Sequence, residues 1–245
     1  MKISSRSFGA ALLLLLVSLT PACVHQSCCV KTALTPIDGA TDPRRSSPEA
    51  ALAALKAGNQ RFLSGHPTAH LDALSKVAGS AAHQYPVACV FACADSRTPP
   101  EAIFDLGIGE LFVCRVAGVA SGVNDDASME YGTAVLGAPL IVVMGHKNCG
   151  AMKAAIANKP LPGSLPQLVA QIRPAVERAE AEFPAGNAKE LLDAATREQV
   201  RGEIRHLMKS PVIKEQIASV KLKIVGPSIT SRMEQSPGSR KTADL

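Results

Sequence analysis

Two short segments of the sequence carry the side chains best suited to chemistry. One reads Cys-Ala-Asp-Ser-Arg at 93–97, and the other reads Gly-His-Lys-Asn-Cys-Gly at 145–150. Two cysteines and one histidine form a three-ligand set for zinc, and catalytic zinc sites keep the fourth position open for water, whereas structural sites close it with protein. The pattern predicts a catalytic zinc site, one ion per chain, with Cys93, His146 and Cys149 as ligands.

Each of these residues also has an interpretation that needs no metal. Cys93 and Cys149 could form a disulfide, and His146 could be a loop histidine bonded to backbone. The carboxylate and arginine two and four positions after the first cysteine could be a surface ion pair, which contributes little to stability. A concave strand end is an unexpected place for such a pair, so we favour a chemical role for Asp95 and Arg97.

Alternating strands and helices must position these segments. Apolar runs predict four strands, and 3.6-residue patterns predict helices between them, which indicates an α/β fold with a mostly parallel sheet. Ligands bind beyond the carboxyl ends of such strands, and both segments follow strand ends, so they meet if the first and third strands are neighbours. The predicted strands are Val87–Cys93, Leu111–Arg115, Leu140–Met144 and Leu222–Val225. The predicted helices are Pro48–Ser64 before Gly65, Leu71–His83, Pro99–Asp105, Ala127–Leu136, Ala151–Ala157, the long stretch Leu165–Leu207, and a short helix opening at Ser210 and Pro211.

The N-terminal residues are predicted to lie outside this domain. Lys2 and Arg6 precede a 12-residue apolar stretch, which is too short to span a bilayer and typical of a signal peptide over residues 1–22. Residues 23–47 are interpreted as a linker, because residues 30–47 are rich in Thr, Pro, Asp and Ser. We expect export to the periplasm or cell envelope. Cys23 directly after Ala22 resembles a lipoprotein box, although Thr20 stands where Leu is usual, so a lipid anchor stays open.

Composition narrows the possible partners. The net charge of +5 is scattered, and only 3% of residues are aromatic, so no basic run interleaved with aromatic residues suggests nucleic-acid binding. Cys89 and Cys114 lie inside apolar runs and are interpreted as buried small hydrophobic residues. No histidine is placed as an obvious proton shuttle; the four expected at the surface are His66, His70, His83 and His206.

The two segments together resemble a known enzyme family. Cys-x-Asp-x-Arg followed by His-x-x-Cys, with 146 − 93 = 53 positions between the first two ligands, closely resembles the β-class carbonic anhydrases. The resemblance extends from Leu52 to Val225 and includes the family's N-terminal helix motif, second strand and following helix, at Ala57–Phe62, Gly109–Arg115 and Ser128–Tyr131. It implies zinc-dependent, reversible hydration of CO2 to bicarbonate and a proton by a domain at residues 48–226.

The resemblance also implies roles for single residues. Asp95 would orient the nucleophile, Arg97 would hold Asp95, and Asp95 released from Arg97 could become a fourth zinc ligand in a closed, inactive state. Part of each pocket in the family comes from a neighbouring subunit, so a homodimer is the expected minimum and higher oligomers are open. The positions that match the family's substrate pocket are Gln84, Phe112, Tyr131 and Gly150.

The sequence departs from the family pattern in three places. Val90 stands where relatives with a regulatory bicarbonate pocket have Trp, so we expect no such regulation. Val119 stands where the family usually has Asn. Residues 227–245 lack the alternation of the family's fifth, edge strand; one back-translation of 227–238, read from the third base, restores a Val-Tyr-x-Leu pattern. We interpret this atypical tail as the product of a frameshift, with loss of the edge strand.

Two other functions stay open from the sequence. Hydrolysis of CS2 or COS could run on the same zinc scaffold, and the motif residues do not separate it from hydration of CO2. A non-catalytic, exported zinc-binding protein is the second alternative, and only the altered tail supports it.

Overall fold

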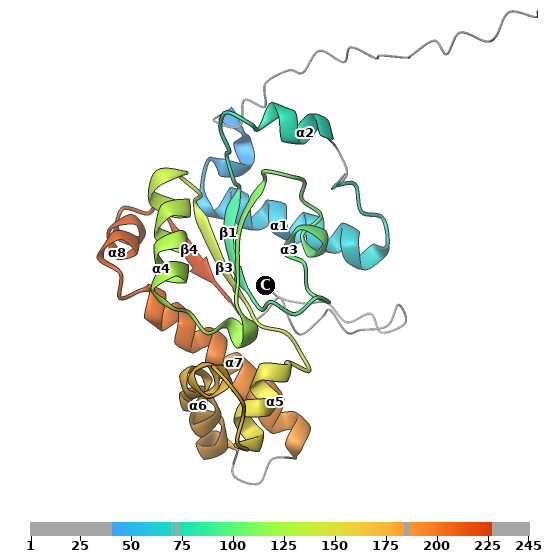
Figure 1. Ribbon diagram of the computed structural model, residues 1–245. Helices are drawn as coiled ribbons and strands as arrows, with labels where there is room; N and C mark the ends of the chain where they lie inside the picture. The colour runs from blue at the N-terminus through green and yellow to red at the C-terminus, as the bar shows by residue number, and fades with distance from the viewer. Residues whose placement is uncertain (1–40, 70, 72–73, 184–186, 227–245) are drawn as a thin grey trace, which may run out of the picture. The chain divides into compact units, whose positions relative to one another are not determined.

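In the described part of the chain, four parallel strands form one central sheet in the order β2-β1-β3-β4 (Figure 1). The computed structural model describes residues 41–69, 71, 74–183 and 187–226, all of which fall in the second of two units, 1–33 and 34–245. The strands are β1 (Ala88–Ala92), β2 (Leu111–Arg115), β3 (Leu140–Met144) and β4 (Lys223–Val225). The predicted α/β fold with a parallel sheet is confirmed, and each strand lies within its predicted range.

Burial along the strands explains their order. Every residue of β1 and β3 is buried, as expected for the central strands of a parallel sheet with both faces covered. The edge strands β2 and β4 are partly exposed. Alternate residues of β1 contribute to two separate cores: Cys89 and Phe91 face one side of the sheet, and Ala88 and Val90 face the other.

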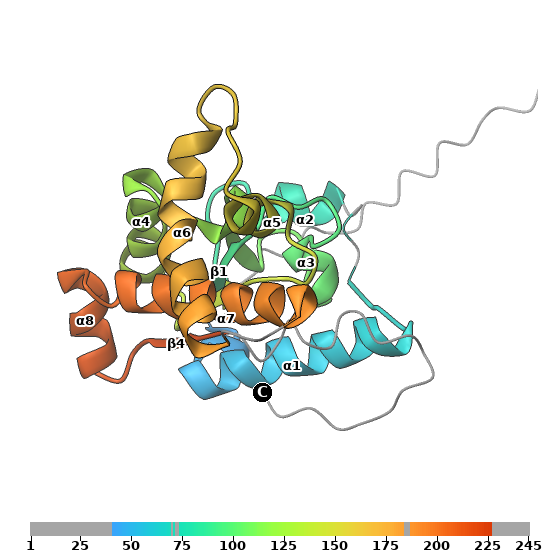
Figure 2. The same ribbon diagram turned by 90° about the horizontal axis from the view of Figure 1, so that it is seen from below.

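Different helices cover the two faces of the sheet (Figure 2). The helices α1 (Pro48–Ser64) and α3 (Pro100–Ile103) pack on the face that contains Val90. The opposite face is covered by α4 (Val123–Glu130), α5 (Gly150–Ala157), α6 (Leu165–Glu182), α7 (Ala188–Leu207) and α8 (Pro211–Ala218).

Three residues of α1 fasten it to the end of α3. Gly58 approaches so closely that a Cβ atom there would lie 1.7 Å from the carbonyl oxygen of Phe104. Asn59 donates a hydrogen bond to the carbonyl of Ile103 at 3.0 Å, and Arg61 forms an ion pair with Asp105. Burial alone would raise the pKa of Asp105, but backbone amides and Arg61 more than offset it and hold that pKa below the usual range. The Gly-Asn-x-Arg motif of this helix therefore packs α1 against the end of α3.

Helix boundaries agree with the sequence where capping signals are present. Ser47 caps the start of α1, and Gly65, with φ of 78°, ends it as predicted. Ser210 caps α8 by accepting a hydrogen bond from the amide of Ile213, as its position before Pro211 predicts.

Three predicted helices were wrong in extent. The stretch 71–83 is helical only over α2 (Leu74–Gly79) among its described residues. The stretch 165–207 is two helices, because Phe183 precedes a proline and adopts the non-helical φ of −126° at the end of α6. The stretch 127–136 begins earlier, since Asp125 accepts the amide of Gly122 and so starts α4, and it ends in a π-helical turn, η4 (Tyr131–Val135).

The last residues of the predicted linker are anchored to the domain. Arg44 pairs with Glu110 at 2.7 Å, and Arg45 donates hydrogen bonds to the carbonyls of Pro86 and Leu136. The predictions for residues 1–40 and 227–245 fall outside the described residues and stay predictions. Among the helices that are described, none has the length and apolar composition needed to cross a bilayer.

Replacing Gly58 should test the contact between α1 and α3. Gly58→Ala places a methyl group against the Phe104 carbonyl, so we expect the free energy of unfolding to fall by about 3 kcal/mol, the upper end of what overpacking costs. Chemical denaturation measures this. Gly202→Ala in α7 is the matched control, because there the nearest atom, at 3.3 Å, is the end of the flexible Arg178 side chain. Equal stabilities of the two variants would contradict the packing argument.

Candidate metal centre

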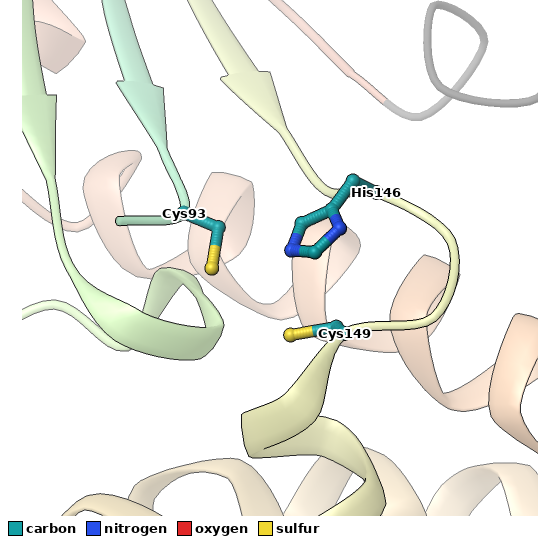
Figure 3. Close-up of side chains that lie close together, drawn as sticks. All are labelled: Cys93, His146 and Cys149. Carbon is teal, nitrogen blue, oxygen red and sulfur yellow. The ribbon is translucent and has the colours of Figure 1, made fainter. Parts of the chain in front are cut away.

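The pairing of β1 with β3 brings the two chemical segments together. Cys93 directly follows β1, His146 follows β3 by two residues, and Cys149 is the N-cap of α5. All three side chains are buried, and their ligand atoms lie within 4.8 Å of one another. Figure 3 shows the three side chains converging on one point from separate elements. The sequence-based expectation that the two strand ends meet is confirmed.

The hydrogen bonding of His146 prepares it for a metal. Its Nδ1 lies 2.9 Å from the carbonyl oxygen of Lys147, which can only accept, so Nδ1 carries the proton and donates. Its Nε2 is buried and has no hydrogen-bond partner among the residues that the structure describes. A buried, unpartnered lone pair is costly, and a metal ion at this point would satisfy it.

The two cysteines form a coupled pair of soft donors. The thiol of Cys149 beside Cys93 lowers the pKa of Cys93, and the Cys93 thiolate in turn raises the pKa of Cys149, so the pair retains one proton. The four cysteines in the described part of the chain are free thiols. Two sulfurs and one imidazole nitrogen are a donor set that fits zinc, and a zinc ion would take the place of the shared proton.

Asp95 lies at the edge of this group and is held by Arg97. The Nε and Nη2 atoms of Arg97 each donate to a different oxygen of Asp95 at 2.8 Å, and the Arg97 amide donates at 3.0 Å. These bonds, led by that of the guanidinium, hold the pKa of Asp95 well below its usual range. One oxygen of Asp95 lies 3.8 Å from Nε2 of His146, so an ionised carboxylate faces the metal group.

Arg115 supports the loop that contains Cys93 and Asp95, and no role was predicted for it from the sequence. From the end of β2 its guanidinium donates to the carbonyls of Cys93, at 2.9 Å, and of Asp95. It thereby fixes the backbone on both sides of residue 94. Its position could have identified it, because Arg115 ends β2 and β2 lies beside β1, the strand that leads into Cys93.

The predicted pocket residues do not surround the metal group within one chain. Phe112 pairs with Cys89, four residues before Cys93, which places it about 13 Å away along the strand. Its ring lies 6.0 Å from that of Tyr131, and Tyr131 and Gln84 both line a surface hollow of about 550 Å³. Gly150, by contrast, follows Cys149 directly, and the space beside its Cα is open.

The structure explains why Val119 is an unusual residue. Its φ is +57°, a left-handed conformation that Asn tolerates and that strains a β-branched side chain. Of the histidines expected at the surface, His66, His83 and His206 are exposed, and His70 lies outside the described residues.

The fold and the site together define an α/β metalloenzyme with a Cys2His metal group at the carboxyl edge of a parallel sheet. A family model described as carbonic anhydrase matches residues 88–232. Carbonic anhydrase 2 of Mycobacterium tuberculosis is 41% identical over 187 residues, covering 74% of this chain and 87% of the relative. A carbonic anhydrase of Mycolicibacterium smegmatis is 38% identical, with coverage of 74% and 88%.

Solved structures agree with the sequence relatives. A tetrameric β-carbonic anhydrase of Sordaria macrospora superposes with a TM-score of 0.57 at 27% identity, covering 72% of this chain and 88% of that one. A Coccomyxa β-carbonic anhydrase in complex with acetazolamide gives 0.58 at 25% identity, covering 71% and 79%. The chain belongs to the β-class carbonic anhydrases.

Removal of one ligand should release the metal. Cys149→Ser replaces a thiolate with a hydroxyl that stays protonated and binds zinc poorly, so we expect the variant to retain no zinc after dialysis against a chelator. Elemental analysis measures this against the unmodified protein. Cys114→Ser is the matched control, because Cys114 donates to Asp125 at 3.0 Å and a serine hydroxyl can do the same. Full zinc content in Cys149→Ser would exclude Cys149 as a ligand.

Proposed function

We propose that the chain catalyses the reversible hydration of CO2 to bicarbonate and a proton at one zinc ion held by Cys93, His146 and Cys149. The observation that carries the proposal is a buried set of three ligands with an ionised carboxylate, Asp95, at its edge. A zinc ion held by these three residues would supply Lewis acidity that lowers the pKa of a water molecule and makes it a nucleophile.

Asp95 and Arg97 prepare the nucleophile for attack. Because Arg97 keeps Asp95 ionised, the carboxylate can only accept hydrogen bonds, and it accepts the O–H of the attacking group and turns its lone pair toward the carbon of CO2. Arg97 is thus a positioning residue. A closed state in which Asp95 leaves Arg97 and becomes a fourth ligand is part of the proposal; the 3.8 Å between Asp95 and His146 supports it.

A second copy of the chain completes the pocket in this proposal. Phe112 lies about 13 Å along the strand from the metal group of its own chain, its ring packs near Tyr131, and Tyr131 and Gln84 line one hollow. This arrangement supports their acting at the metal group of a neighbour. A tetrameric relative is among the similar structures. A homodimer is therefore the minimum active unit, and Gly150 is the pocket residue that each chain supplies to its own metal.

The proposal also places the enzyme outside the cytoplasm. Its support is the sequence of residues 1–22, with the basic residues Lys2 and Arg6 before a short apolar stretch, which is typical of a signal peptide. The mature protein lies in the periplasm or cell envelope, and a lipid on Cys23 would anchor it there. We also propose that the altered tail at 227–245 is the product of a frameshift.

Neither alternative function gains support from the comparisons. The relatives described above are carbonic anhydrases, and nothing among them favours CS2 or COS as substrate or a non-catalytic role.

Stopped-flow hydration of CO2 tests the function directly. We expect fast turnover with about one zinc per chain, since the ligand set holds a single ion. If the protein binds zinc and turns over COS but not CO2, it is a hydrolase of the alternative kind. Zinc with neither activity would support a non-catalytic protein.

Loss of the Arg97 side chain should separate activity from metal binding. Arg97→Ala frees Asp95 to rotate while leaving all three ligands in place, so we expect kcat to fall by about 10–100-fold at unchanged zinc content. Arg205→Ala, which removes an exposed arginine of α7, is the control. Retained activity in Arg97→Ala would rule out the proposed positioning.

Turnover should rise as the pH increases above about 7. Two thiolates offset the formal charge of zinc, whereas three neutral imidazoles leave it whole, so water activated at this site should be less acidic than at a site of three histidines. The pH dependence of kcat/KM measures this. A profile that is already flat at about pH 6 would contradict the argument.

A further inference from the structure

A strained turn touches the first metal ligand. The turn η3 (Ala117–Val119) follows β2, and the amide of its Gly118 donates a hydrogen bond to Sγ of Cys93 at 3.3 Å. Gly118 has a φ of 69° and no room for a side chain, because a Cβ would lie 2.4 Å from Ile172. Val119 follows with a φ of 57°. Two successive left-handed residues, one of them β-branched, do not hold this conformation by their own preference.

The side chain of Gln199, from α7, holds the turn in place. It is buried, and its Nε2 donates to the carbonyl of Val119 at 3.1 Å. The same nitrogen donates to Glu203, one turn further along α7, at 2.8 Å. Glu203 in turn accepts the hydroxyl of Ser121 at 2.6 Å. Val119 is thus bonded to Gln199 and Ser121 to Glu203, and the bond between Gln199 and Glu203 links the two ends of the segment 119–121.

The position of Gln199 relative to the metal group makes this more than general packing. A cavity of about 10 Å³ is lined by Gly118, Val119, His146, Cys149 and Gln199. Gln199 therefore lies next to both the turn and the ligands, and only this small cavity separates it from them. Its amide holds the Val119 carbonyl, which is only two peptide units along the chain from the Gly118 amide that donates to Cys93.

We propose that Gln199, fixed by Glu203, is a positioning residue for the metal centre: it holds the 117–119 turn so that the Gly118 amide donates to the Cys93 thiolate. A hydrogen bond to a ligand sulfur withdraws electron density from it and fixes its direction, so it tunes how strongly and how selectively the metal is held. The inference rests on the zinc site of the proposed function and adds an outer support that the ligand motifs do not contain.

Cobalt in place of zinc tests the inference through the metal rather than through turnover. Gln199→Met keeps the length of the side chain and removes both donated bonds. We expect the thiolate-to-cobalt charge-transfer band to move to lower energy, because the sulfur becomes more electron-rich. We expect zinc affinity, measured by chelator competition, to fall by about 10-fold, because the direction of the Cys93 sulfur is no longer fixed. Glu203→Gln, made in the unmodified chain, can still accept from Gln199 through its amide oxygen and donate to the Ser121 hydroxyl through its amide nitrogen, so both readouts should stay near those of the unmodified protein. Gln167→Met, the same substitution at an exposed position of α6, should change neither.

The unmodified protein provides a second measurement that needs no variant to fold. With cadmium-113 in the site, the amide proton of Gly118 should show scalar coupling to the metal through the hydrogen bond to Cys93. Absence of this coupling overturns the proposal, as does a Gln199→Met protein that loses thermal stability but keeps the band and the affinity. If the unmodified protein binds zinc and turns over CO2 in either case, the proposed function stands and only the role of Gln199 is lost.

Discussion

The parallel hydrogen bonding between β1 and β3 is the constraint on which the site depends. These strands are far apart in sequence and adjacent in the sheet, with Ala92 paired to Met144. Because both strands run in the same direction, the residues that follow them emerge at one edge, and Cys93 and His146 need only one and two further residues to meet. A shift of this register by one residue would turn every side chain of one strand to the opposite face and separate the ligands. Both strands are buried along their whole length, so the close packing of their side chains on each face opposes such a shift.

Much of the fold could be predicted because its signals are local. The strand Leu140–Met144 is a continuous apolar run, and the helix Pro48–Ser64 has a capping serine, a proline at its first position and a glycine at its end. The long stretch Leu165–Leu207 misled the prediction because apolar residues continue at helical spacing on both sides of the break. The π-helical turn at Tyr131–Val135 had no sequence signal that we recognise, since it depends on how Gly132 packs against Cys89 and Phe112.

The ligands of the site could be predicted, whereas the support from α7 could not. Cys93, His146 and Cys149 belong to residue types and spacings that few other purposes require. Arg115 at least ends a strand beside the one that leads into Cys93, but Gln199 acts through a backbone carbonyl, and a bond to a carbonyl leaves no trace in the identity of the residue that accepts it. Gln199 is also 80 positions from its acceptor, Val119. Only the folded chain shows that α7 passes behind the metal group.

The spacing of the ligands has a consequence for folding. An ion bound to Cys93 and His146 joins two points that are 146 − 93 = 53 residues apart, as a covalent cross-link would. A site that exists only in the native chain stabilises it by an amount that grows with the logarithm of the ratio of free ion to its dissociation constant. The unfolded chain meanwhile loses the conformational freedom of a long loop if it keeps the ion. A chain that binds the metal soon after synthesis would therefore unfold and be proteolysed less readily than one that does not, independently of any reaction that the site performs.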